Sequence, residues 1–69
     1  MINKKTIGDR LRKERSERGM SMSVAAAAIG ITKPALSNYE NGWRVPRDEE
    51  KIKIARYYEK SVEDLFFST

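Results

Sequence analysis

Apolar residues recur along this chain at intervals of three and four, which is the spacing of one face of an α-helix. Ile7 and Leu11 begin such a stripe, and Arg15 continues it at the same interval. Further stripes follow, and glycine, proline and serine residues separate them. The pattern predicts an all-α fold of five helices. These helices are expected to begin near Thr6, Met22, Lys33, Asp48 and Ser61.

The stretch SMSVAAAAIGITKPALSNYENG, residues 21–42, has the order of two short helices joined at a glycine. Gly30 follows the alanine-rich run, and glycine readily adopts the left-handed backbone angles that end a helix. The hydroxyl groups of Ser21 and Thr32 can cap the two helices. Pro34 lies in the opening turn of the second helix, where a missing N–H costs little. The stretch therefore predicts a helix-turn-helix.

The second helix of this motif has two faces of different chemistry when its residues are placed every 100°. Leu36, Tyr39 and Glu40 fall on one side, which is therefore expected to pack inward. The opposite side carries polar or small residues, which are Lys33, Pro34, Ser37, Asn38 and Asn41. Ammonium, hydroxyl and amide groups bond to base edges or phosphates, so this outer side predicts contact with DNA.

Single residues on the outer side allow more than one role. Asn38 fits a bidentate contact with adenine, and the alternative is a solvated amide. Ser37 can bond either a base or its own backbone. Pro34 has no side-chain donor or acceptor, so it can only pack on a base edge such as a thymine methyl group. Direct readout is therefore expected from Lys33, Ser37 and Asn38.

Together these residues resemble the helix-turn-helix core of the lambda repressor and Cro-like family, often called the xenobiotic-response-element type. The likeness rests on Gly30-Ile31-Thr32, on Leu36-Ser37-Asn38-Tyr39-Glu40-Asn41-Gly42 and on Pro46. It extends in register to positions on both sides of the motif, namely Arg15, Gly19, Met20, Ile54, Ala55, Tyr58, Ser61 and Leu65. It implies a five-helix domain that binds duplex DNA.

The resemblance also implies roles for particular residues. Arg15 and Glu40 both lie on inward-facing sides, and the likeness implies that they meet as the ion pair typical of this fold. The alternative is two unrelated surface charges, because helical spacing alone is forgiving. In the family, the loop after the second helix lies along the phosphate backbone. This implies phosphate contacts by Asn41, Gly42 and Arg44.

The chain departs from the family in the first helix of the motif. Met22 stands where a glutamine commonly contacts the DNA backbone, and Ala27 and Ala28 replace charged residues. Met22 also continues an inward stripe that holds Ala26 and Ile29. Packing in the core is therefore favoured for Met22 over a phosphate contact.

Charge is distributed unevenly. Residues 1–47 contain ten Lys/Arg and four Asp/Glu, a net charge of +6, whereas residues 48–69 contain four and six, a net charge of −2. The basic part holds the helix-turn-helix and suits a polyanionic partner. In the first helix, basic residues alternate with acids and are expected to have only a general electrostatic role. They are Arg10, Arg12, Lys13 and Arg18.

The composition excludes several classes of function. The chain has 69 residues, room for a single domain of 1–69, and it has no cysteine and no histidine. Thiol nucleophiles, imidazole bases and the usual zinc ligands are therefore absent, so we expect no enzyme activity, metal or cofactor. No apolar run reaches the ~20 residues of a membrane span, and MINKKTIGDR lacks the apolar core of a signal peptide. The expected location is the cytoplasm.

Three local expectations concern positions outside the motif. Thr6 is expected to cap the first helix, which leaves Met1 to Lys5 outside it. The fourth helix is expected to run from Asp48 to Glu59, with Ile52 on its apolar side. Trp43 has two open interpretations, because it can cover the edge of the core or pack on the sugar-phosphate backbone.

Two adjacent phenylalanines near the C-terminus cannot both point inward on a short helix. We therefore expect Leu65, Phe66 and Phe67 to form a homodimer interface, and the alternative is that both phenylalanines fill the core. Two copies of so small a domain would multiply specificity on an inverted-repeat operator. The expected function is a sequence-specific transcriptional regulator, a repressor acting by operator occlusion. The alternative is a protein-interaction module, such as an antitoxin-like or accessory subunit.

Overall fold

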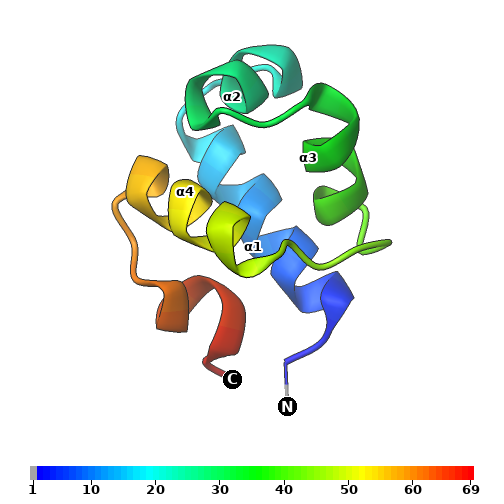
Figure 1. The fold of residues 1–69 in the computed structure, drawn as a ribbon, viewed down its shortest axis with the longest axis vertical. Coiled ribbons are helices and arrows are strands. Elements are labelled where there is room, and N and C mark those ends of the chain that lie inside the picture. Colours follow the sequence, from blue (N-terminus) through cyan, green and yellow to red (C-terminus); the bar gives the residue numbers. More distant parts are fainter. Residues whose placement is uncertain (1) are drawn as a thin grey trace.

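The computed structural model describes residues 2–69, which form five helices and no strand. In chain order they are α1 (Lys4–Glu17), α2 (Met22–Ile29), α3 (Lys33–Glu40), α4 (Asp48–Tyr58) and the short π-helix η1 (Glu63–Phe67). Figure 1 shows α2 and α3 toward one end of the molecule and both chain termini at the other. The prediction of an all-α, five-helix fold is confirmed.

The helix-turn-helix is capped as predicted. Ser21 Oγ accepts a hydrogen bond from the N–H of Val24, and Thr32 Oγ1 accepts one from the N–H of Ala35, each at 3.2 Å. Between the two helices, Gly30 has a φ of +94°, in the left-handed region where a side chain would be strained. The turn therefore has the local chemistry that the sequence indicates.

The predicted start of α1 is wrong. Asn3, not Thr6, is the N-cap, and its side chain accepts a hydrogen bond from the N–H of Thr6 at 2.9 Å. Asparagine is the stronger capping residue, so the helix begins earlier and includes Lys4 and Lys5. The expectation for Met1 lies outside the described residues.

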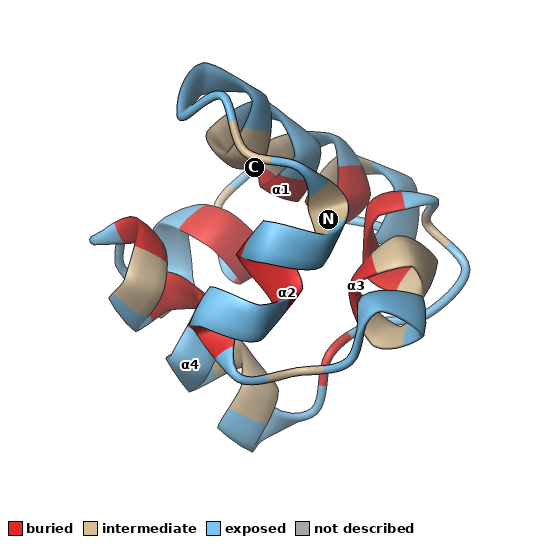
Figure 2. Ribbon diagram, turned by 90° about the horizontal axis from the view of Figure 1, so that it is seen from above, coloured by how far each residue is buried: buried red, intermediate tan, exposed pale blue. Residues whose placement is uncertain are grey.

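The core lies where α1, α4 and η1 meet, below the helix-turn-helix. Its fully buried members include Leu11, Ile54, Tyr58 and Phe66. A second, smaller cluster of Ala25, Ala26 and Leu36 joins α2 to α3. Figure 2 shows these buried positions on the inward sides of the helices, with exposed positions on the outer sides. The small side chain of Ala26 allows α2 and α3 to approach closely.

The fourth helix differs from its prediction in two ways. Ile54, Ala55 and Tyr58 are buried as expected, but Ile52 is 49% exposed, so its placement on the apolar side is wrong. Successive residues of a helix lie 100° apart, and burial of 54, 55 and 58 turns 52 toward solvent. The helix also ends at Tyr58, because Glu59 adopts a left-handed conformation with a φ of +56°.

At the C-terminus, the two phenylalanines point in different directions. Ser61 Oγ accepts a hydrogen bond from the N–H of Asp64 at 3.0 Å, and the turn that follows buries Leu65 and Phe66. Phe67 is 52% exposed. The predicted interface is therefore corrected: Leu65 and Phe66 belong to the core of the domain, and of the three residues only Phe67 exposes its side chain.

Within residues 2–69, no helix combines the length and the apolar character that crossing a membrane requires.

Candidate nucleic-acid interface

The helix α3 presents the two faces that the sequence predicts. Leu36, Tyr39 and Glu40 are buried, whereas Lys33 and Pro34 are exposed. Ser37 and Asn38 are half-buried at the outer side, and Asn41 follows them as an exposed C-cap. The polar groups considered for base contacts therefore lie along one solvent-facing side of a single helix.

An ion pair fixes α3 to α1. Arg15 donates to both carboxylate oxygens of Glu40, from Nε to Oε2 and from Nη2 to Oε1, each at 2.9 Å. The Glu40 side chain is fully buried and that of Arg15 is 16% exposed. The hydrogen bond with Glu40 raises the pKa of Arg15 above its ordinary value. The ion pair implied by the family resemblance is confirmed, and the alternative of two surface charges is wrong.

Three arginines that were expected to have only a general electrostatic role make specific hydrogen bonds. They are Arg10, Arg12 and Arg18. Arg12 Nη2 donates to Asn41 Oδ1 at 3.2 Å, and Arg12 Nε lies 3.8 Å from Glu40 Oε1. Arg10 donates to the carbonyl of Asp64, and Arg18 to the carbonyl of Tyr58. These contacts join residues far apart in the sequence, so helical spacing gave no signal for them.

A glycine sets the distance between α1 and α3. A Cβ atom at Gly8 would lie 2.6 Å from the carbonyl oxygens of both Tyr39 and Glu40, closer than real Cβ atoms approach. The role of Gly8 could not be predicted from the sequence, because it depends on the neighbouring helix and leaves no local pattern. Its buried position allows the C-terminal turn of α3 to rest directly on α1.

Backbone hydrogen bonds hold the loop that follows α3. The carbonyl of Asn38 accepts from the N–H groups of Trp43 at 3.0 Å and Arg44 at 3.3 Å. The N–H groups of Asn41 and Gly42 donate to carbonyls of α3. These main-chain N–H groups are therefore already paired with carbonyl groups of α3, and the side chain of Arg44 is exposed beside them.

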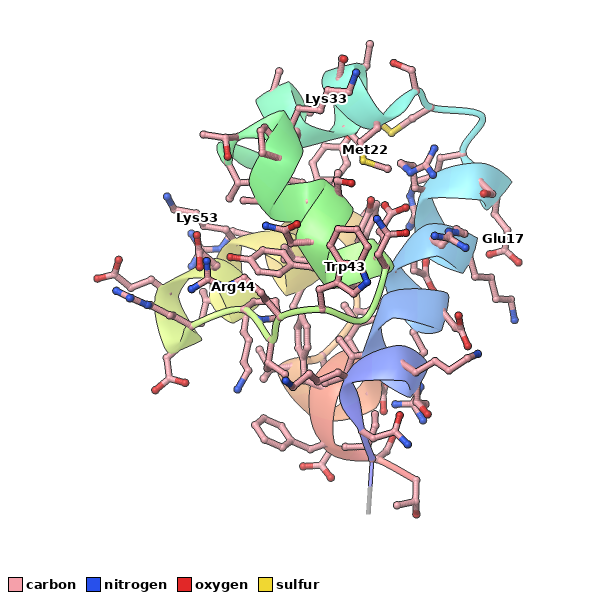
Figure 3. The ribbon with its side chains drawn as sticks, turned by 90° about the vertical axis from the view of Figure 1, so that its right-hand side faces the viewer. Glu17, Met22, Lys33, Trp43, Arg44 and Lys53 are labelled. Carbon is pink, nitrogen blue, oxygen red and sulfur yellow. The ribbon has the colours of Figure 1, made fainter. Side chains whose placement is uncertain are left out.

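The side chain of Trp43 is 68% exposed. The interpretation that it covers the edge of the core is therefore wrong. Figure 3 shows Trp43 on the same side of the molecule as Lys33 and Arg44, directly after α3, the recognition helix that is expected to contact DNA. Packing of the ring on the sugar-phosphate backbone of a bound duplex stays a prediction.

A second carboxylate ties α3 to the loop and to α4. Tyr39 donates from its hydroxyl to Glu50 Oε1 at 2.7 Å, and the same oxygen accepts from the N–H of Arg47 at 3.3 Å. Burial, with the hydrogen bond to Glu50, raises the pKa of Tyr39 to about 12. A tyrosine hydroxyl of ordinary pKa is already protonated at neutral pH, so the raised pKa extends this hydrogen bond, and the tie between the loop and α3, to more alkaline pH.

Basic side chains extend the outer side of α3 beyond the residues that the sequence indicated. A shallow depression of about 730 Å³ between α3 and α4 contains Arg44, Arg47 and Lys53. The first turn of α4 contributes three acids to it, Asp48, Glu49 and Glu50. Figure 3 shows Lys53 near Arg44. The position of Lys53 beside Arg44 was not predicted, because Lys53 belongs to the part of the sequence with a net negative charge.

Met22 is half-buried and packs against the cluster of Ala25, Ala26 and Leu36. Its predicted packing role is confirmed. Figure 3 shows Met22 near the end of α3 at which Lys33 lies.

A capped pair of short helices, a buried ion pair beneath the second and polar side chains along its outer side define a helix-turn-helix DNA-binding protein. The helix-turn-helix family model matches residues 11–65 of the chain. The chain belongs to this family, in its Cro/CI type, whose members are DNA-binding transcriptional regulators.

Solved structures show the same fold. The restriction-modification controller protein C.AhdI from Aeromonas hydrophila is 25% identical, with a TM-score of 0.82 over 91% of this chain and 91% of that chain. The clp gene regulator ClgR from Corynebacterium glutamicum is 23% identical, with a TM-score of 0.79 over 94% of this chain and 84% of that chain. No curated protein matches the sequence.

Proposed function

We propose that the protein is a sequence-specific repressor that occupies an operator in duplex DNA and thereby excludes the transcription machinery, in the cytoplasm. The observation that carries this proposal is the outer side of α3, where exposed Lys33 and Pro34 adjoin half-buried Ser37 and Asn38. Family membership supports it, since occupying an operator requires only the DNA-binding domain that the family model matches over residues 11–65.

Direct readout is assigned to the middle of α3. Asn38 is half-buried on the outer side of α3, and a side-chain amide can make a bidentate contact with adenine N6 and N7. Lys33 lies at the entry of the helix, and Pro34 can only pack on a base edge such as a thymine methyl group. Asn38 is therefore expected to contribute most to the choice of sequence.

Phosphate contacts are assigned to side chains around α3. Arg44 follows the helix on an exposed loop, and Asn41 and Gly42 bring that loop close to the end of α3. Contacts of this kind fix the register of the protein on the duplex without reading its sequence.

The working unit on DNA is proposed to be a two-fold homodimer joined beside Phe67. Phe67 and Val45 are exposed apolar residues, and both line an apolar groove of about 460 Å³ that also involves Ile2. A second copy of the chain is the proposed occupant, because two-fold pairing would place the recognition helices about 34 Å apart, one turn of an inverted repeat.

Selection from a pool of randomised duplexes tests this proposal. The wild-type protein should enrich one inverted repeat, and Asn38→Ala should lose about 1–3 kcal/mol on that site but little on random DNA. A reporter should be repressed when the selected site overlaps its promoter, and not when the site is moved well upstream. Enrichment of no sequence, or equal loss on selected and random DNA, would contradict the proposed readout.

A further inference from the structure

A chain of side chains connects α1 with the outer side of α3. Arg12 Nη2 donates to Asn41 Oδ1 at 3.2 Å, and Asn41 Nδ2 donates to Ser37 Oγ at 3.2 Å. Arg12 is itself held at the buried Glu40, with Nε 3.8 Å from Oε1 and Nη2 3.5 Å from the Glu40 carbonyl oxygen. A residue outside the helix-turn-helix therefore reaches a side chain on its DNA-facing side.

The chemistry of these groups fixes the direction of every hydrogen bond. A guanidinium group has only donors, so the atom of Asn41 that faces Arg12 must be the amide oxygen. The amide nitrogen then faces Ser37 and must donate to it, because an amide NH₂ group has no acceptor. The orientation of the Asn41 side chain follows from Arg12.

This direction determines what Ser37 can offer to DNA. A hydroxyl group has one hydrogen to donate, and the Ser37 oxygen already accepts from Asn41. Among residues 2–69, this is the only side-chain hydrogen bond of Ser37, so its own hydrogen is not used inside the domain. Base edges in the major groove carry both donors and acceptors, and a hydroxyl preset in this way favours an acceptor.

We infer that Arg12 is a positioning residue for sequence readout: through Asn41, it presets the hydroxyl of Ser37 as a donor to a base acceptor. The acceptor classes are the N7 of a purine, the O6 of guanine and the O4 of thymine. This inference rests on the proposed function, since it assigns a specificity to one residue of the same interface. It also gives Arg12 a role that a simple phosphate contact would not produce.

The inference predicts an effect at one base position, which single-atom base analogues can locate. The selected duplex is prepared with 7-deazapurines, which lack N7, with 2-aminopurine, which lacks the O6 of guanine, and with 5-methyl-2-pyrimidinone, which lacks the O4 of thymine. Each replacement is made at one position at a time. Wild-type protein should lose about three- to tenfold in affinity at the position that Ser37 contacts, the value of one hydrogen bond.

Three variants then test the route from Arg12 to that position. Ser37→Ala should bind more weakly and show no further loss at the analogue. In Arg12→Ala, the loss of affinity caused by the analogue, expressed as a logarithm, should be less than half of the loss in wild type. Asn41→Asp keeps an acceptor for Arg12 but replaces the donor toward Ser37 with an acceptor, so the Ser37 hydrogen is drawn away from DNA and the penalty should disappear.

Lys13→Ala is the matched control for charge. Lys13 is exposed and lies about one helical turn after Arg10. Because Arg10 reaches the carbonyl of Asp64 in η1, both residues lie on the side of α1 away from α3. Its loss removes the same charge from the same helix and should leave the analogue penalty unchanged. Thermal unfolding of each variant verifies that the domain remains folded at the binding temperature.

The results separate the inference from the proposed function. A penalty that is the same in Arg12→Ala and in wild type overturns the inference, even if affinity falls equally on all duplexes. A scan in which no acceptor at any position depends on Ser37 overturns it as well. Failure to enrich any duplex in the preceding selection overturns the proposed function, and the inference with it.

Discussion

Glu40 is the most constrained residue of the interface, because its carboxylate is fully buried and accepts from Arg15 while Arg12 lies 3.8 Å away. Replacing Glu40 with alanine would leave two cationic groups without their shared partner. A carboxylate that loses Arg15 would keep only the more distant and half-exposed Arg12. The pair therefore stabilises the position of α3 mainly through the cost of breaking it.

We predict that Arg15→Ala and Glu40→Ala each lower the free energy of unfolding by roughly 3–5 kcal/mol, since each strands an opposite charge. Arg15→Ala should fall at the lower end because Arg12 remains. Urea denaturation measures both. The double change Arg15→Met with Glu40→Leu should recover much of the loss, as matched apolar residues leave no buried charge. Single variants that unfold with the wild type would contradict the pair's structural role.

Trp43 is the only tryptophan, so its fluorescence reports directly on its surroundings. If its ring packs on the sugar-phosphate backbone, saturating selected duplex should shift its emission to shorter wavelength or quench it. Trp43→Ala should weaken binding by about 1 kcal/mol, and Trp43→Phe by less, because an aromatic ring still covers the sugar. Emission that does not change when DNA is bound would place Trp43 outside the interface.

At the residue scale, local sequence patterns predicted the side chains on the outer face of α3 better than the contacts from α1 that hold them in place. The two faces of α3 and the caps at Ser21 and Thr32 depend on neighbours in sequence, and both could be predicted. The Asn41 contact of Arg12 depends on a helix 29 residues away, so no local signal exists for it. The exposure of Trp43 also depends on residues outside its own segment, so the sequence alone could not decide whether its side chain is buried or exposed.

Among the elements, the contact between α1 and α3 depends on the missing side chain of Gly8. In an isolated helix, replacing glycine with alanine stabilises by about 1 kcal/mol. Here a methyl group would meet two carbonyl oxygens at 2.6 Å, so the helices must separate. We predict that Gly8→Ala destabilises the fold by about 1–3 kcal/mol, the usual cost of overpacking.

Urea denaturation of Gly8→Ala tests this contact by the sign of the change. Ser16→Ala, at an exposed position of the same helix, is the control and should change stability little. A Gly8→Ala variant that is as stable as the wild type, or more stable, would show that α1 and α3 can be spaced more widely at no cost.

Element boundaries were predicted less well than the existence of elements. Asn3 displaced Thr6 as the cap of α1, and both residues belong to the class that caps helices. Ile52 was expected on the apolar side of α4, but the register of α4 on the core turned it outward. Register between elements is a tertiary property, which explains why helical periodicity left it undecided.

For the molecule as a whole, two exposed apolar positions allow a sharp test of the proposed dimer. Phe67 lines the apolar groove and is 52% exposed, whereas Ile52 is 49% exposed and lies outside it. We predict that Phe67→Glu shifts the protein from dimer to monomer in sedimentation equilibrium at micromolar concentration. Ile52→Glu, the matched control, should leave the dimer unchanged.

The same experiment is repeated on an inverted-repeat duplex. Wild-type protein should bind as two copies, and Phe67→Glu should require higher concentrations for the second copy. A wild type that stays monomeric even on the inverted repeat would contradict the dimer, and an unfolded Phe67→Glu would return Phe67 to the core.

The most direct test of DNA binding through α3 and its loop is the salt dependence of affinity for the selected duplex. Log affinity should fall with log salt at a slope of several units, because basic side chains release counterions from the phosphates. Lys33→Ala and Arg44→Ala should each flatten this slope by about one unit, while Lys13→Ala leaves it unchanged. A slope near zero, or equal slopes in wild type, Lys33→Ala and Arg44→Ala, would contradict the assigned interface.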